Sequence, residues 1–210
     1  MFCYGWVQDS QEPISRLQGV ALQVDYGEVT LLRVEPLPGI PLEIGYSLWT
    51  LEETRRRTLG YVKTIRQAAL DHQPANQRNS VATLLYHIAV FEMDWLYVDM
   101  LGGGYDEERR IPKCPPEVAD HLPYPLLEED GSYTRVSGEP LEVHLDRLAV
   151  TRKAFLDEVS SMTLDGFRTP GPSESNELTP EWIVEHLAQH EAEHRGQIWE
   201  ARTAAEKQTT

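Results

Sequence analysis

A helix that carries three histidines is encoded near the end of the chain by Thr179-Pro180-Glu181-Trp182-Ile183-Val184-Glu185-His186-Leu187-Ala188-Gln189-His190-Glu191-Ala192-Glu193-His194-Arg195-Gly196-Gln197-Ile198. Thr179 is a favoured residue type for a helix cap, and Pro180 suits the first helical position, where its missing N–H costs nothing. At 3.6 residues per turn, one face collects Ile183, Leu187, His190, His194, Ile198 and Ala201. The pattern therefore predicts that His190 and His194 point toward the interior.

The spacing of these histidines is the second feature of the stretch. His190 and His194 are separated by about 6 Å along the helix axis, a spacing at which two imidazoles can bind one ion. His186 and His194 are separated by about 12 Å of rise and about 80° of rotation, so one ion cannot contact all three. The alternative is that the histidines only pack in the core as hydrogen-bonded residues. Because burying several imidazoles without a partner is costly, a metal site on one adjacent pair is favoured.

The letters His190-Glu191-Ala192-Glu193-His194 also match the HExxH pattern of zinc proteases. Those enzymes take a third ligand from further along the chain, but this sequence ends at residue 210 and contains no histidine after His194. Glu200 is too close on the same helix to serve. The protease interpretation is therefore disfavoured, and a third ligand is expected from upstream.

The composition describes a globular chain. Its 210 residues are 40% hydrophobic and 25% charged, which indicates one domain or a domain with an appendage. A net charge of −15 argues against nucleic acid or an anionic membrane as partner. No stretch approaches the length of a membrane span, and no signal segment is evident at the N-terminus. Two cysteines, Cys3 and Cys114, suggest reduced thiols and a cytoplasmic location.

The first part of the chain differs from the rest. Residues 20–24 and 29–34 are rich in β-branched residues and flank a turn at residues 25–28, which predicts a β-hairpin. Three prolines then form a stiff connector. An isolated hairpin is marginally stable, so we expect residues 1–39 to form a small extension that packs on its own helices or supports a dimer.

Four amphipathic helices follow, at about residues 47–71, 80–101, 141–161 and 180 onward. In the second helix His87 shares the apolar face, and Asp94 lies only about 20° from it in projection. We expect Asp94 or His186 to orient a ligand or a bound water. The run Arg55-Arg56-Arg57 in the first helix predicts a solvated face, with anion binding as the alternative.

Residues 102–138 are rich in proline, glycine and charge. A connection of this length in a compact domain is usually functional or mobile. We expect it to cover the open side of the metal and to influence which substrate binds. Four helices of this length can enclose one core, and facing helices in such bundles commonly build metal sites.

Two of these helices and the start of the first carry a resemblance. The segments are Gly39-Ile40-Pro41-Leu42-Glu43-Ile44-Gly45-Tyr46-Ser47-Leu48-Trp49, then Asn79-Ser80-Val81-Ala82-Thr83-Leu84-Leu85-Tyr86-His87-Ile88-Ala89-Val90-Phe91-Glu92-Met93-Asp94-Trp95-Leu96, and His190-Glu191-Ala192-Glu193-His194-Arg195-Gly196-Gln197-Ile198 within the last helix. Together they resemble the DinB-like (damage-inducible) superfamily over about residues 40–204.

The resemblance implies a mainly α fold, an up-down-down-up four-helix bundle over residues 40–210 that holds one divalent ion, often nickel or zinc. Carried over position by position, it implies His87, His190 and His194 as the metal ligands. His186 then becomes a pocket residue or supports a ligand from behind. Similar proteins include thiol-cofactor S-transferases and mycothiol-dependent isomerases, and they are often dimers. Residues 1–39 and 102–138 lie outside the common pattern.

The chemistry of such a site can be argued from its donors. Three neutral imidazoles leave a divalent ion with open positions, as in catalytic rather than closed structural sites. Such an ion lowers the pKa of bound water to about 7 or holds a thiol as thiolate. The first hypothesis is therefore a metal-dependent hydrolase or thiol S-transferase that acts on a small molecule. The alternative is a non-catalytic module that binds or sequesters a small molecule in the same pocket.

Overall fold

The computed structural model describes residues 33–75, 79–172 and 177–207. The predicted β-hairpin lies almost entirely outside the described residues, and its role in a dimer stays a prediction. Residues 33–41 form a connector that reaches the first helix, where Leu37 N–H donates to the carbonyl of Gly45 at 3.1 Å. A Cβ at Gly45 would lie 2.9 Å from the Leu37 carbonyl oxygen and from Pro36 Cβ, so glycine permits this close approach.

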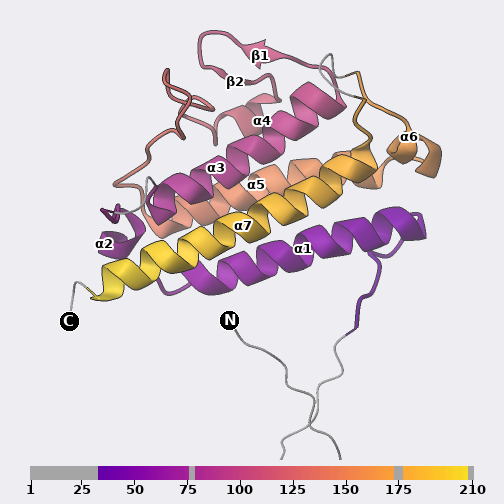
Figure 1. The fold of residues 1–210 in the computed structure, drawn as a ribbon. Helices are drawn as coiled ribbons and strands as arrows, with labels where there is room; N and C mark the ends of the chain where they lie inside the picture. The colour runs from indigo at the N-terminus through magenta and orange to yellow at the C-terminus, as the bar shows by residue number, and fades with distance from the viewer. Residues whose placement is uncertain (1–32, 76–78, 173–176, 208–210) are drawn as a thin grey trace, which may run out of the picture. The chain divides into compact units, whose positions relative to one another are not determined.

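Four long helices pack side by side around the core (Figure 1). They are α1 (Leu42–Val62), α3 (Val81–Asp94), α5 (Leu141–Ser160) and α7 (Pro180–Lys207). Helix α1 lies against α7 and α5, and α3 lies against α5 and α7, so each helix has two long neighbours. The mainly helical fold is confirmed, while the up-down-down-up order of the helices stays a prediction.

Helix starts were the most predictable local feature. The Ser80 hydroxyl accepts a hydrogen bond from Thr83 N–H at 3.1 Å at the start of α3. The Thr179 hydroxyl accepts one from Trp182 N–H at 3.2 Å at the start of α7, with Pro180 in the first helical position. Both caps satisfy a backbone donor that has no partner within its helix, as the residue types predict.

The first helix differs from the expected span of residues 47–71. It starts at Leu42, directly after Pro41, and ends at Val62. The chain then turns and forms a separate short helix, α2 (Gln67–Leu70), which buries Leu70 against the core. The apolar pattern continued across this turn because Ile65 and Leu70 are both buried, so periodicity alone did not reveal the break.

Every residue of α3 except Phe91 is buried, which makes it the central helix of the domain. It continues into a π-helix, η1 (Trp95–Met100), which ends shortly before three consecutive glycines, residues 102–104. By length and composition the segment Val81–Met100 could cross a membrane, with a mean hydropathy of 1.2. However, 78% of its most apolar window is buried inside the protein, as expected of a core helix in a soluble protein.

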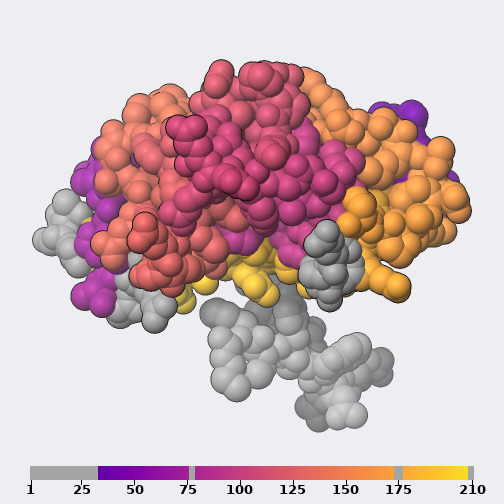
Figure 2. All heavy atoms as spheres, turned by 90° about the horizontal axis from the view of Figure 1, so that it is seen from above, coloured from indigo at the N-terminus to yellow at the C-terminus, as the bar shows by residue number. Residues whose placement is uncertain are grey.

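The long connection between α3 and α5 contains short ordered elements. Strands β1 (Tyr105–Asp106) and β2 (Ile111–Pro112) pair antiparallel, and helix α4 (Pro116–Ala119) follows. Figure 2, seen from above, shows this segment spread over one face of the domain. A further short helix, α6 (Leu164–Arg168), connects α5 to α7.

A network of buried charges joins all four long helices. Arg55 of α1 donates to Glu92 of α3 and to Glu191 of α7, each at 2.9 Å. Arg152 of α5 donates to the same two carboxylates, at 2.9 Å to Glu191. All four residues are at most 5% exposed. Each carboxylate therefore accepts hydrogen bonds from two guanidinium groups, and each guanidinium binds two carboxylates.

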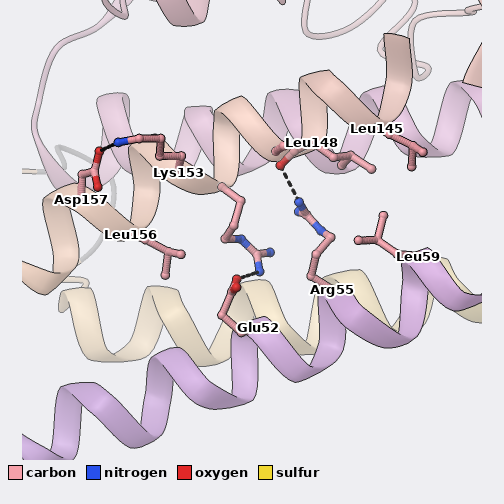
Figure 3. Close-up of a pocket in the computed structure, with 10 residues that line it drawn as sticks. Glu52, Arg55, Leu59, Leu145, Leu148, Lys153, Leu156 and Asp157 are labelled. Carbon is pink, nitrogen blue, oxygen red and sulfur yellow. Dashed lines mark hydrogen bonds and ion pairs between the residues drawn. The ribbon is translucent and has the colours of Figure 1, made fainter. Parts of the chain in front are cut away.

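The two arginines also hold α1 and α5 together. Arg55 donates to the carbonyl of Leu148 at 2.7 Å (Figure 3), and Arg152 donates to Glu52 at 2.9 Å. The prediction that the three arginines form a solvated face is thus wrong for Arg55, which is buried. It is correct for Arg56 and Arg57, which are exposed. Arg55 differs because its position on α1 faces two carboxylates from other helices, which a pattern within one helix does not contain.

Replacing Arg55 with Met should lower the free energy of unfolding by about 3–5 kcal/mol, because it leaves buried carboxylates without one of their partners. Arg56→Met is the matched control, since Arg56 is the adjacent arginine and lies on the exposed side. Urea unfolding of both variants measures the difference. Equal stability of the two variants would contradict a structural role for the buried network.

Candidate metal centre

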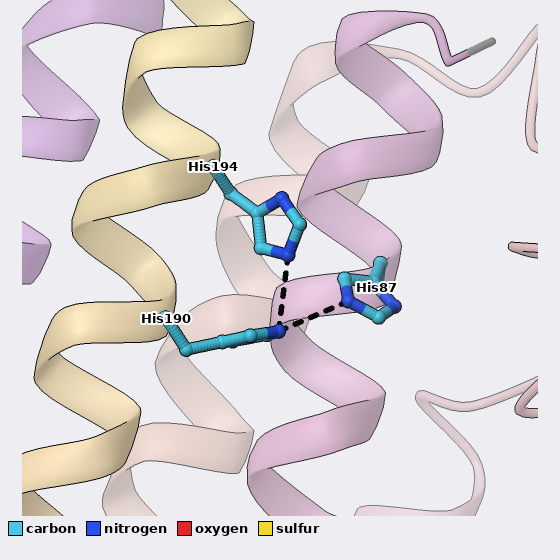
Figure 4. A group of neighbouring side chains, drawn as sticks. All are labelled: His87, His190 and His194. Atoms are coloured by element: carbon cyan, nitrogen blue, oxygen red, sulfur yellow. Dashed lines mark hydrogen bonds between the residues drawn. The ribbon is translucent and has the colours of Figure 1, made fainter.

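Three histidines from two helices converge at one place in the core. His87 lies on α3, and His190 and His194 lie on α7 (Figure 4). Nε2 of His190 is 3.1 Å from Nε2 of His87 and 3.0 Å from Nε2 of His194. One ligand atom from each ring lies within 4.8 Å of the others. The structure thus brings together the three residues that the resemblance implied.

The spacing of these nitrogens fits one divalent ion. Two imidazole nitrogens bound to a tetrahedral zinc ion at about 2.0–2.1 Å are separated by about 3.3 Å. The two contacts of His190 Nε2, at 3.0 and 3.1 Å, differ from this value by a few tenths of an ångström. Without an ion, His190 Nε2 would face two other ring nitrogens and could donate to only one. The cluster is therefore compatible with metal binding.

The protonation state of the rings also suits ligation. Burial, with the charges of the neighbouring histidines, lowers the pKa of His87 to about 2. Burial likewise lowers the pKa of His190 to about 4 and lowers that of His194. The three rings are consequently neutral near pH 7, and a neutral imidazole is the form that binds a metal.

Residues around the cluster hold the rings in place. The side-chain oxygen of Gln197 accepts a hydrogen bond from His194 Nδ1 at 3.0 Å, which leaves the lone pair on Nε2. The ring of Tyr133, from the long connection, stacks on His87 with centroids 3.6 Å apart. Phe91, which lies one turn after His87 on α3, also contacts the His87 ring, with centroids 4.0 Å apart.

The sequence did not identify Gln197 or Tyr133. Gln197 had a detectable signal, because a residue three positions after a ligand lies beside it on a helix. No sequence pattern identified Tyr133, because its contact with His87 depends on the path of the long connection between α3 and α5. The contact places part of residues 102–138 beside His87, and the expectation that this connection covers the open side of the metal stays a prediction.

Asp94 is hydrogen-bonded to the long connection, and His186 is a ring neighbour of His190. The carboxylate of Asp94 accepts a hydrogen bond from the Tyr105 hydroxyl at 2.7 Å, at the start of the long connection. The ring of His186 stacks on Trp182, with centroids 4.9 Å apart, and its centroid is 6.1 Å from that of His190. Neither residue hydrogen-bonds a histidine of the cluster within the described chain. Their role in orienting a ligand stays a prediction.

Glu191, the glutamate of the HExxH letters, turns away from the cluster. Both of its carboxylate oxygens accept hydrogen bonds from buried arginines, Arg55 and Arg152. Burial alone would raise the pKa of Glu191, but the charges of the two arginines outweigh it and lower that pKa. A carboxylate with both oxygens engaged in this way cannot act as the base of a zinc protease, which agrees with the sequence argument.

The sequence matches the model of the DinB superfamily over residues 50–198. The chain belongs to the DinB superfamily. The matched range contains His87, His190 and His194, and it confirms the resemblance seen in the sequence. A comparison with proteins of curated function gives no match. Because DinB-like proteins bind metals, family membership and the histidine geometry agree with each other.

In this DinB protein, Gln197→Leu should weaken metal binding about 10–100-fold, because His194 loses the acceptor that orients it. Gln189→Leu is the control, an exposed glutamine on the same helix. Competition with a chromophoric chelator measures both affinities. If the two variants bind metal equally, Gln197 does not support the ligand.

Asp94→Asn should stabilise the protein at neutral pH. Burial, together with the charge of Asp99, raises the pKa of Asp94 from 3.8 to about 6, although the Tyr105 hydrogen bond acts in the opposite direction. The wild type should therefore lose stability relative to the variant as pH rises from about 4 to about 6, by roughly 2–3 kcal/mol in total. Asparagine keeps an acceptor for Tyr105.

Denaturant unfolding of both proteins across this pH range gives the test. The quantity of interest is the difference between the two free energies of unfolding, since other titrating groups are common to both proteins. A difference that does not change with pH would show that Asp94 titrates as an ordinary exposed carboxyl.

Proposed function

We propose that this DinB-superfamily protein is a metal-dependent enzyme, a hydrolase or a thiol S-transferase, that holds one zinc or nickel ion on His87, His190 and His194. The observation that carries the proposal is the convergence of three neutral imidazole nitrogens from α3 and α7. Three protein ligands leave room for a further ligand, as is typical of catalytic sites.

The bound ion would supply a water of lowered pKa or a stabilised thiolate. Side chains of the protein hold the histidine ligands in position and exclude water from His87. Gln197 keeps the Nε2 lone pair of His194 directed at the common point, and the rings of Phe91 and Tyr133 cover His87. His190 is half-buried, whereas His87 and His194 are buried.

Both reactions need a small molecule to reach the open side of the cluster. A pocket of about 570 Å³, lined in part by Tyr133 and Gln197, adjoins two of the histidines through these side chains. That volume lies within the range of small-molecule sites in proteins. The pocket therefore supports a small-molecule substrate.

His190→Ala should abolish stoichiometric metal binding, because His190 lies between the other two ligands. His121→Ala is the control, since His121 pairs with Asp146 outside the cluster. Metal content after dialysis is measured by mass spectrometry. A full equivalent of metal in the His190 variant would refute the ligand assignment.

The same two variants test catalysis. Zinc- and nickel-loaded protein is assayed for ester and amide hydrolysis and for conjugation of thiols to electrophiles. Turnover that is lost on chelation and in the His190 variant, and kept in the His121 variant, is the expected result. Stoichiometric binding of these compounds without turnover would favour the non-catalytic binding module.

A further inference from the structure

The pocket lined in part by Tyr133 and Gln197 is polar, and it adjoins the histidine cluster. Two of its lining residues each contact a different histidine of the cluster. Tyr133 stacks on His87, and the oxygen of Gln197 accepts the hydrogen bond of His194 Nδ1. A molecule in the pocket would therefore touch the side chains that hold two of the three histidines.

Gln197 also offers a donor to this pocket. When His194 binds an ion through Nε2, its proton is on Nδ1, and the Gln197 oxygen accepts it. The amide nitrogen of Gln197 then faces away from His194, and the residue is exposed. The amide of Asn79 lines the same pocket. Two amides can thus hydrogen-bond a polar ligand.

The charged residues of the pocket narrow the class of ligand. Arg135 lines it, and the guanidinium of Arg135 has no hydrogen bond or ion pair with any residue in the described ranges. Only its backbone N–H is bound, by Glu128 at 3.1 Å. In a chain of net charge −15, an arginine beside a pocket, with guanidinium donors that no residue of the described ranges engages, can bind an anionic group.

A carboxylate, of opposite charge to Arg135, lines the same pocket. One oxygen of Asp130 accepts the N–H and the hydroxyl of Ser132, at 2.9 and 2.6 Å, and these hydrogen bonds lower the pKa of Asp130. Asp130 and Arg135 both line the pocket, and the charge of Arg135 also contributes to lowering the pKa of Asp130, although the two side chains form no salt bridge. The second oxygen of Asp130 can accept from a ligand amine or hydroxyl.

We propose that this pocket binds the substrate of the metal centre, and that the substrate is a small polar molecule with a carboxylate that pairs with Arg135. An amine or hydroxyl of the same molecule faces Asp130, and the reacting group extends past Tyr133 and Gln197 to the ion. This inference rests on the proposed function, because it assumes an ion with an open position at the three histidines.

The test uses cobalt-loaded protein and two thiols as probes, N-acetylcysteine and its carboxamide. The thiols share one metal-binding group and differ in a single negative charge. Binding of a thiolate to cobalt gives a charge-transfer absorption band, which is titrated for the wild type, Arg135→Gln and Arg66→Gln. Arg66 is the control because it is exposed and lines a different pocket.

Arg135→Gln should weaken binding of N-acetylcysteine about 10-fold or more and leave the carboxamide within about twofold, because only the acid loses a charge-assisted hydrogen bond. Arg66→Gln should change neither affinity. The two thiols differ in the pKa of their own thiol group, so their affinities are not compared with each other. For each thiol, the affinity for a variant is compared with the affinity for the wild type. Circular dichroism checks that the variants are folded.

The outcomes separate the two proposals. A cobalt band with both thiols that Arg135→Gln leaves unchanged, or weakens equally, overturns the carboxylate site and leaves the proposed function standing. Absence of the band in wild-type protein that retains cobalt overturns the open metal position and, with it, the substrate site. If Arg66→Gln weakens the binding of N-acetylcysteine as much as Arg135→Gln does, the effect is one of net charge in general. That result would also overturn the role of Arg135.

Discussion

The reciprocal pairing of two buried arginines with two buried glutamates is the constraint on which the arrangement of the long helices depends. Arg55, Glu92, Arg152 and Glu191 come from α1, α3, α5 and α7 respectively, and each carboxylate is shared by both guanidinium groups. Taking each charge out of water costs several kcal/mol, and only complete pairing offsets that cost. If one helix slid along another by a turn, a buried charge would lose its partners. The network therefore selects one register for all four helices.

That register also sets the geometry of the histidines. Glu191 directly follows His190 in α7, and Glu92 lies little more than a turn after His87 in α3. His190 and the four charged residues line one gap that has no room for a water molecule. The pairing that aligns Glu92 and Glu191 thus aligns His87 and His190. A metal centre built from two helices needs such an alignment, because a displacement of about 1 Å would separate the ligand nitrogens.

Local features of this chain were predictable, and contacts between distant segments were not. The caps at Ser80 and Thr179, the long helices and the inward direction of His190 follow from patterns within about twenty residues. The burial of Arg55 depends on carboxylates more than thirty residues away in sequence, and nothing in its own helix distinguishes it from Arg56. Tyr133 likewise reaches His87 through the fold of a proline-rich connection.

The segment from His190 to His194 shows that an HExxH match depends on what its glutamate faces. Successive residues of a helix differ by about 100° in direction, so α7 can present His190 to the metal site and Glu191 to the buried arginines. With both of its oxygens occupied, Glu191 stabilises the fold and cannot take a proton from a bound water. A group that donates or accepts a proton during the reaction would instead come from the pocket lined by Tyr133 and Gln197. Burial, with the charge of Glu193, raises the pKa of Tyr133, so its hydroxyl stays protonated near neutral pH and is available to donate a hydrogen bond, while its ring stacks on His87.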